Sequence, residues 1–299
     1  MGYFFAILGY ALYASVNYVD KFVLQKYEIE PAVISIYTGF SALIASLLIL
    51  LFTGFHLLTF QSASVIIISG ILTQFYLLPY FKALTLDEAS RVVPLFEMTP
   101  IIVLLLGFLF LGEALSLKQY IGAFLIVSSS ILLTVEQLEA KIFSIRPALW
   151  YMLLTCVLYG SAIFLFKVGL KQDVPFWTAL PYEGLGIIIG SLLILGYKNN
   201  FTLLKQTTKE KGKKIFLFMS LNDAIFISGR YTQYFALTIL SVSFVSVLEG
   251  FQPLFALLFG LILSIWFPHL LEEVISKKNV GLKVVAIVLI FSGLYLLFL

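Results

Sequence analysis

The chain has 299 residues, of which 61% are hydrophobic and 12% are charged, with a formal net charge of +3 at pH 7. Together with a mean hydropathy of +1.04, this excludes a water-soluble domain, because no soluble fold of this size buries so much apolar surface. The charged residues gather in short stretches and leave apolar runs that can cross roughly 30 Å of hydrocarbon as helices. The composition predicts an all-α polytopic membrane protein.

Ten apolar runs follow one another along the chain, and they lack the alternating ~10-residue pattern of membrane barrel strands. They lie at residues 3–24, 32–53, 63–84, 89–111, 118–135, 148–170, 176–197, 214–238, 241–266 and 280–298. No basic segment precedes the first run, so we interpret it as a retained span and not as a signal peptide. The longest loop, residues 198–213, leaves no room for a soluble catalytic domain.

The two halves of the sequence repeat each other. Around residue 37, Y-T-G-F-S-A-L-I-A-S-L-L-I-L matches Y-E-G-L-G-I-I-I-G-S-L-L-I-L from residue 182. This duplication predicts a five-helix repeat over 1–138, a short linker over 139–146 and a second five-helix repeat over 147–299. Because five is an odd number, the second repeat must cross the membrane upside down relative to the first, which gives inverted repeats.

Basic residues are distributed unequally between the two sides of the predicted spans. Six lysines fall between residues 198 and 214, on the side that also carries most of the other basic residues. Taken alone, this bias places those loops in the cytoplasm and both termini outside. The lysine cluster suits topology and anionic headgroups better than nucleic acid, so no nucleic-acid partner is predicted.

The fourth and fifth spans of each half share a motif pattern. The first copy reads A-L-T-L-D-E-A-S-R-V-V-P-L-F-E-M-T-P, F-L-F-L-G-E-A-L-S and Y-I-G-A-F-L-I-V, and the second reads A-L-T-I-L-S-V-S-F-V-S-V-L-E-G-F-Q-P-L-F-A-L-L-F-G. This duplicated unit resembles the EamA-type carriers of the drug/metabolite transporter superfamily. The second copy departs from the pattern, since W-F-P-H-L-L-E-E replaces G-E and puts Glu272 or Glu273 in the place of Glu113.

The resemblance implies a basket of ten helices in the membrane, the inner membrane if the source is prokaryotic. Spans one to four and six to nine would surround a central cavity. Spans five and ten would be peripheral, where a homodimer contact is expected. The resemblance also implies cytoplasmic termini, which disagrees with the Lys/Arg bias and leaves the orientation open.

Acidic residues beside prolines are candidates for a site, because a charge in hydrocarbon costs several kcal/mol unless it faces a partner or a water-filled cavity. Glu97 lies three residues before Pro100, and Glu249 lies four before Pro253. Each proline frees a carbonyl near its acid, so the prolines are candidate hinges. The acids are candidates for proton coupling or for binding a substrate ammonium. The alternative is that each acid pairs with a nearby base.

The eighth span carries the densest set of polar residues. Arg230 lies two helical turns after Asp223, so both can face one cavity, and a guanidinium suits a substrate carboxylate or Glu249. A structural ion pair with Glu249 or Asp223 is the alternative. The other cavity candidates are Tyr13, Asn17, Gln74, Glu183, Asn222 and Tyr231.

Small residues one turn apart predict close helix packing. Ser41 and Ala45 of the second span correspond to Gly186 and Gly190 of the seventh. Because the pattern recurs at the same place in both halves, we interpret it as a packing face.

Several classes of function lack their motifs. The chain has no G-x-x-x-x-G-K-S/T loop, no H-E-x-x-H and no G-x-S-x-G, so neither nucleotide-driven transport nor an enzyme is predicted. His56 and His269 have no neighbouring ligands at metal spacing, so we expect no metal and no cofactor.

The sequence therefore favours a secondary transporter for a small polar or amphipathic metabolite, with amino acids as the leading substrates. The alternatives are a carrier of nucleotide sugars or lipid-linked intermediates, or a membrane scaffold without flux.

Overall fold

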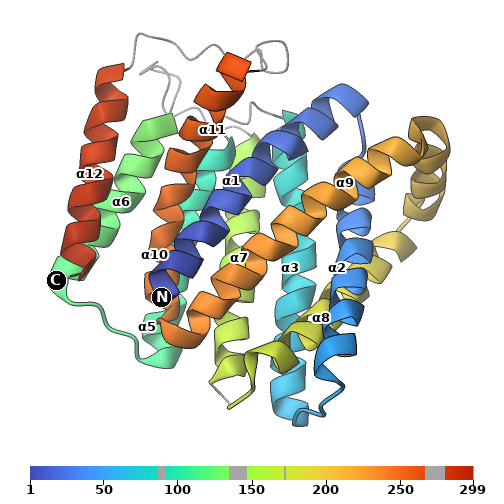
Figure 1. Ribbon diagram of the computed structural model, residues 1–299, viewed down its shortest axis with the longest axis horizontal. Coiled ribbons are helices and arrows are strands. Elements are labelled where there is room, and N and C mark those ends of the chain that lie inside the picture. Colours follow the sequence, from blue (N-terminus) through green and yellow to red (C-terminus); the bar gives the residue numbers. More distant parts are fainter. Residues whose placement is uncertain (87–91, 135–146, 172, 267–279, 299) are drawn as a thin grey trace.

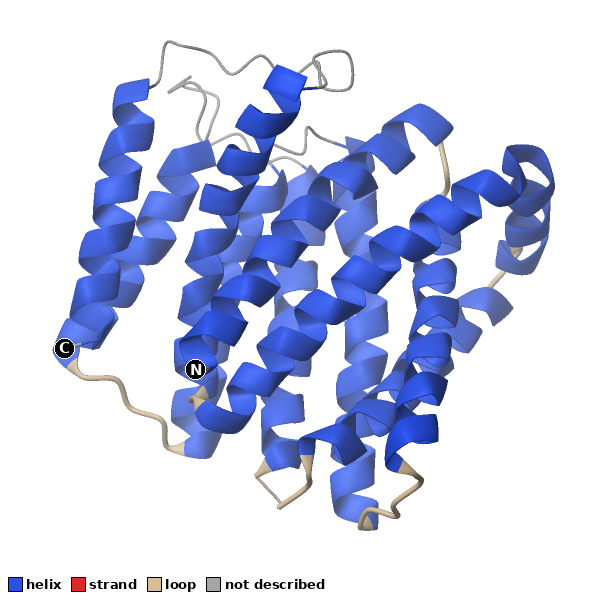
Figure 2. Ribbon diagram, in the orientation of Figure 1, coloured by secondary structure: helices blue, strands red, loops and turns tan. Residues whose placement is uncertain are grey.

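The computed structural model describes residues 1–86, 92–134, 147–171, 173–266 and 280–298. Figure 2 shows only helices and loops in this part of the chain. The helices are α1 (Gly2–Tyr27), α2 (Pro31–Thr53), α3 (Phe60–Leu86), the 3₁₀ helix η1 (Val93–Met98), α5 (Thr99–Leu111), α6 (Leu117–Thr134), α7 (Pro147–Leu170), α8 (Phe176–Gly196), α9 (Asn200–Ile239), α10 (Val242–Val247), the 3₁₀ helix η3 (Leu248–Phe251), α11 (Gln252–Trp266) and α12 (Val280–Phe298).

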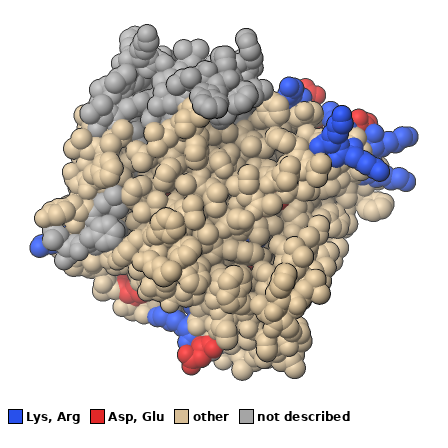
Figure 3. Space-filling view, in the orientation of Figure 1, with Lys and Arg blue, Asp and Glu red and all other residues tan. Residues whose placement is uncertain are grey.

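The chain is an integral multi-pass membrane protein. In the described residues, four helices are long and apolar enough to cross a bilayer: α2, α3, α7 and α8. The face drawn in Figure 3 is mostly uncharged, and its charged side chains gather near the edges. Large apolar side chains such as Phe52 and Phe60 are almost fully exposed, which suits contact with lipid and not with water. The number of ten spans and the inversion of the repeats stay predictions.

Long-range helix pairs build the bundle. The helix α1 packs along α9, α2 packs against α8, and α3 packs against both α7 and α8. The helices α6 and α12 pack against each other at one end of the molecule (Figure 1). A Cβ atom added to Gly186 would lie 2.0 Å from the carbonyl oxygen of Ile67, and one added to Gly190 would lie 2.8 Å from Cβ of Gln74. The face of α8 that carries Gly186 and Gly190 therefore brings the α8 backbone close to α3.

The predicted loop over residues 198–213 is wrong. Residues from Asn200 onward are helical, and the helix is interrupted at Gly212, whose φ of 76° lies in the left-handed region that glycine tolerates. Leu203 and Leu204 pack against the core while the lysines stay exposed. Hydropathy alone missed this helix because lysine and glutamate lower the mean hydropathy but are good helix formers.

The two acid–proline segments share one backbone design. The predicted runs 89–111 and 241–266 are interrupted by η1 and η3, just before the candidate hinge prolines Pro100 and Pro253. Proline has no N–H for the carbonyl four residues earlier, which is that of Phe96 for Pro100 and that of Glu249 for Pro253. In both segments the residue before the proline donates to that carbonyl instead. The tight turns therefore satisfy the backbone that each proline disrupts.

Candidate functional site

A cavity lies among α1, α2, α3, α7 and α9, and residues of η1, η3 and α11 complete its wall. The space open to the centres of water molecules is about 40 Å³, which is enough for a few waters. Neither α6 nor α12 contributes a described residue to the wall.

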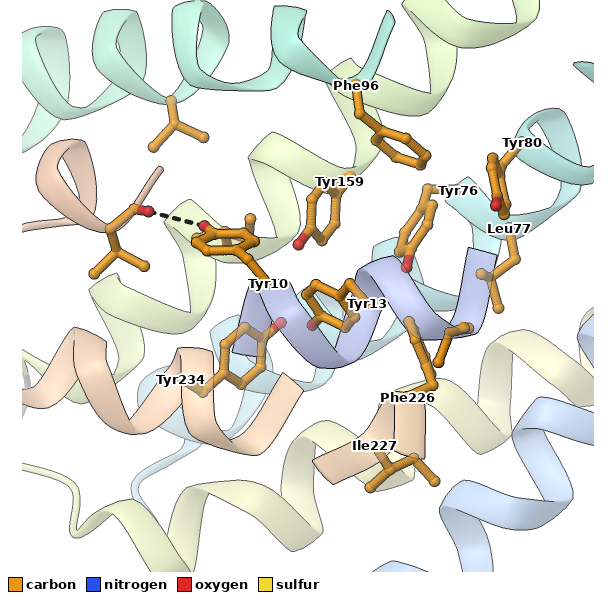
Figure 4. Close-up of a cluster of buried hydrophobic side chains, with 14 of the residues drawn as sticks. Tyr10, Tyr13, Tyr76, Leu77, Tyr80, Phe96, Tyr159, Phe226, Ile227 and Tyr234 are labelled. Carbon is orange, nitrogen blue, oxygen red and sulfur yellow. Dashed lines mark hydrogen bonds between the residues drawn. The ribbon is translucent and has the colours of Figure 1, made fainter. Parts of the chain in front are cut away.

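Aromatic rings form one part of the wall. The ring centroid of Tyr76 lies 4.8 Å from that of Tyr159, and the centroid of Phe96 lies 6.0 Å from Tyr159 and 5.1 Å from Tyr80. Figure 4 shows these rings together with Tyr13, whose centroid lies 5.6 Å from that of Phe226. These residues come from α1, α3, η1, α7 and α9, so the rings join helices that are far apart in the sequence.

A buried glutamine connects the tyrosines. The side-chain oxygen of Gln233 lies 3.1 Å from the hydroxyl of Tyr13 and 3.3 Å from that of Tyr159. Its amide nitrogen donates to the hydroxyl of Tyr10 at 2.9 Å, and that hydroxyl donates to the carbonyl oxygen of Val245 at 2.8 Å (Figure 4). Gln233 was not among the predicted site residues. An uncharged amide among apolar helical residues was its only signal.

Two aspartates tie α1, α2 and α9 together at the cavity. Asp20 accepts a hydrogen bond from the amide of Asn222 at 2.8 Å. Asp223 accepts from Thr38 at 2.9 Å and from Ser41 at 2.7 Å, one bond to each carboxylate oxygen. Both aspartates line the cavity, although Asp20 was not among the predicted site residues.

The two proline-associated glutamates occupy different places. Glu249 is 1% exposed, lines the cavity, and leaves its Oε2 without a hydrogen-bond partner among the described residues. Glu97 is equally buried but does not line the cavity. The two carboxyl groups are near enough to interact electrostatically.

Arg230 lies outside the cavity wall and forms an ion pair with Glu183. The Nε atom of Arg230 is 3.6 Å from Oε1 of Glu183, with side-chain exposures of 2% and 0%. The partner is therefore neither Glu249 nor Asp223, which the sequence analysis had named. The guanidinium carbon also lies 5.3 Å from the centre of the Phe226 ring, which itself lines the cavity.

The predicted site residues thus fall into two groups. The structure brings Tyr13, Asn17, Asn222, Asp223 and Glu249 together around the cavity, and it leaves Arg230, Glu183, Glu97, Gln74 and Tyr231 outside the wall. Asn17 accepts a hydrogen bond from Tyr80 at 3.2 Å, whereas Gln74 donates to the carbonyl oxygen of Ser35 at 2.6 Å and joins α3 to α2. His269, Glu272, Glu273 and the linker 139–146 lie outside the described residues.

Two charged side chains cap helices near residue 240. Glu113 accepts hydrogen bonds from the backbone N–H groups of Val242 and Ser243, at 3.2 and 3.1 Å, at the start of α10. A carboxylate at this position complements the positive end of the helix dipole. Lys167 donates to the carbonyl oxygen of Leu240 at 2.8 Å, at the end of α9. No cluster of three or more histidines, cysteines or acids that could hold a metal occurs in the described ranges.

Comparisons with known proteins agree with the motif resemblance. Residues 1–135 match the EamA-like transporter family. A stretch of 68 residues is 41% identical to "Uncharacterized transporter in cobO 3'region" of Sinorhizobium sp, and the match covers 23% of this chain and 48% of that protein, about half its length. One solved crystal structure superposes with a TM-score of 0.65 over 99% of this chain and 98% of the other, at 17% identity, which shows a shared fold. The predicted resemblance to EamA-type carriers is confirmed.

Proposed function

We propose that this chain, whose first 135 residues match the EamA-like transporter family, is a secondary transporter that moves a small polar or amphipathic organic molecule by alternating access. One observation supports this most strongly: a cavity in a helical membrane protein is lined by the ionisable side chains of Asp20, Asp223 and Glu249. Ionisable groups at such depth are costly and mark substrate or ion pathways.

We also propose the finer architecture of ten spans in two inverted five-helix repeats, residues 1–138 and 147–299, joined by the linker 139–146. Both predicted repeats contribute to the cavity, the first through α1, α2, α3 and η1 and the second through α7, α9, η3 and α11. Tyr13 and Tyr159, which correspond between the repeats, both approach Gln233. A site at a repeat interface is the usual arrangement in carriers of this kind.

The cavity must widen to admit an organic substrate, because its present space suits only a few waters. The breaks at η1 and η3, each just before a proline, are the proposed hinges, since short 3₁₀ segments interrupt the α-helical bonding there. Opening toward α2 would separate the hydroxyls of Thr38 and Ser41 from Asp223. The carboxylate of Asp223 would then take part both in binding substrate and in the movement of α2.

Amino acids are the substrates that the sequence favoured, and they belong in the first transport panel. Proton coupling through Glu97 or Glu249 is part of the proposal. Substituting both with glutamine should abolish pH dependence of transport, and an unchanged pH profile would contradict coupling through these acids. A nucleotide-sugar carrier is less well supported, because the described cavity wall has no lysine or arginine for a phosphate.

Transport can be tested by counterflow in proteoliposomes. Purified protein is reconstituted with an unlabelled compound inside, and entry of the labelled compound is followed for amino acids, amines and nucleotide sugars. We expect saturable exchange of one compound class, reduced in Glu249→Gln and retained in the control Glu210→Gln, whose side chain is exposed. Folded protein that exchanges none of these compounds would favour the non-transporting scaffold.

A homodimer through α6 and α12 stays a prediction. The two helices pack against each other, and their outer faces carry exposed apolar side chains such as Phe124 and Phe291. Crosslinking of cysteines introduced on these faces, in native membranes, would test it.

A further inference from the structure

We propose that the cavity takes a small organic cation, an amine whose ammonium group is received by the acidic side chains and whose carbon skeleton contacts the aromatic rings. The proposal rests on the transport function above, because it names the substrate class of the same site.

The ionisable side chains of the described cavity wall, other than tyrosines, are all acidic. They are Asp20 of α1, Asp223 of α9 and Glu249 of η3, and no lysine, arginine or histidine occurs among the described lining residues. Carboxylates buried without a compensating cation are strongly destabilised. A positively charged substrate would supply that compensation, whereas a carboxylate or phosphate would add to the repulsion.

The nearby basic groups Arg230 and Lys167 lie outside the described cavity wall. The guanidinium of Arg230 pairs with Glu183 and lies over the ring of Phe226. The ammonium of Lys167 donates to the carbonyl oxygens of Leu237 and Leu240. The carboxylate of an amino acid would therefore meet no cation in the described cavity wall, although Nε and Nη1 of Arg230, outside that wall, have no hydrogen-bond partner among the described residues. This separates a simple amine from the zwitterions that the sequence favoured.

Unsatisfied acceptors mark where an ammonium would bind. Oε2 of Glu249 and Oδ1 of Asn222 are buried and have no hydrogen-bond partner in the described part of the chain, and both residues line the cavity. An ammonium N–H donates to such oxygens, and a hydrogen bond to a charged group is among the stronger ones. Nδ2 of Asn17, another lining residue, is a buried donor without a hydrogen-bond partner among the described residues. This amide is neutral and suits a hydroxyl or carbonyl oxygen of the same substrate.

The aromatic wall also favours a cation. The ring centroids of Tyr76, Tyr159 and Phe96 lie 4.8 to 6.5 Å from one another, and all three residues line the cavity together with Glu249. The faces of aromatic rings attract ammonium groups through their quadrupoles and accept alkyl groups by apolar contact. Rings and carboxylates in one wall thus match both ends of an alkylamine.

The test compares three compounds built on one 3-methylbutyl unit: isoamylamine, which carries only an amino group, leucine, which carries an amino group and a carboxylate, and 4-methylpentanoate, which carries only a carboxylate. The purified full chain is kept in detergent at one pH and ionic strength, and binding is measured by calorimetry and by the shift in Tm. We expect the amine to bind with a Kd at least about tenfold lower than either relative. Equal or tighter binding of leucine or of the acid would overturn the proposal, as would no binding of the amine to folded protein.

Variants tie the selectivity to the cavity. Asp223→Asn and Glu249→Gln keep side-chain shape and remove negative charge, so each should weaken amine binding by about tenfold or more. Glu210→Gln removes an exposed acid and should leave binding unchanged. Circular dichroism melts show whether each variant is folded. If Asp223→Asn fails to fold, Glu249→Gln provides the test, and unchanged binding in that variant would overturn the proposal.

Exchange in proteoliposomes separates this proposal from the transport function. Binding of the amine without exchange would contradict transport and leave the cation site intact. Exchange of leucine but not of the amine would keep the transporter and overturn the cation site. We expect exchange of the amine, reduced in Glu249→Gln.

Discussion

Two places on α9, two helical turns apart, handle charge in opposite ways. Toward α1 and α2, Asp223 lines a cavity, and the described wall around it contains acids but no base. Two helical turns further along, Arg230 is buried against Glu183 of α8 outside the cavity wall. An acid paired with a base suits a fixed interface between helices, whereas acids without a basic partner suit a site that binds a cation. A charged residue within a span therefore indicates function only when its partner is known.

The largest expected effect is on the compensated side. Arg230→Met should lower the free energy of unfolding by about 3–5 kcal/mol, because Glu183 would stay buried without its counter-ion. Unfolding of the purified variant, followed by circular dichroism, measures this. The double variant Arg230→Met with Glu183→Gln should recover much of the loss. If the single variant is as stable as wild type and loses substrate affinity instead, Arg230 is a binding residue. The contrast between a structural Arg230 and the cavity acids would then not hold.

The next largest effect is expected where α8 packs against α3 at Gly186, three residues after Glu183. Gly186→Ala should destabilise the protein by about 1–3 kcal/mol, since the new Cβ would lie 2.0 Å from the backbone oxygen of Ile67. Thermal unfolding checks this. The matched change Gly196→Ala, where no atom lies within 4 Å of the added Cβ, should have little effect. A neutral Gly186→Ala variant would show that α8 is not held against α3 as described.

On the uncompensated side, the expected loss is in ligand affinity, and stability should not fall. Removing the charge of Glu249 should cost about tenfold in substrate affinity, about 1.4 kcal/mol. The variant Glu97→Gln should cost less affinity, because Glu97 lies outside the cavity wall. Titrating both variants with the same ligand measures this difference in affinity. Equal losses would mean that the two acids act as one unit.

The smallest change concerns the tyrosine network at the edge of the cavity. Tyr13→Phe removes the hydroxyl that lies 3.1 Å from the oxygen of Gln233 and should cost about 0.5–1.5 kcal/mol of stability. Chemical unfolding measures it. The hydroxyl of Tyr159 lies 3.3 Å from the same oxygen and is unchanged in this variant, so the loss of stability should be small. A loss above that range would indicate that the aromatic wall had collapsed.

Much of the helical architecture was predictable from the sequence, because apolar runs must form helices in lipid. The runs 32–53, 148–170, 176–197 and 280–298 agree with α2, α7, α8 and α12 within a residue or so at each end. The helical segment after Asn200 was missed, since its lysines mask the leucines that hold it to the core. The prolines indicated breaks in their spans, and η1 and η3 provide them.

The candidate site was only partly predictable. Tyr13 and Asn17 are one turn apart, and they share the cavity as that spacing suggests. Asp20 and Thr38 were missed, although an acid in an apolar run was a visible signal for the first. The hydroxyl of Thr38 gave no signal, because its partner Asp223 is 185 positions away in the chain.

The sequence alone was enough to show that this protein crosses the membrane as helices, and it predicts that the two halves are related and that certain polar residues lie within the spans. Those properties follow from hydropathy and local spacing, which act along the chain. Only the tertiary structure decided that Arg230 meets Glu183 and that the acids gather in one cavity. Pairing between helices depends on their rotation and depth, and these are set by side-chain packing such as that of Gly186 against α3.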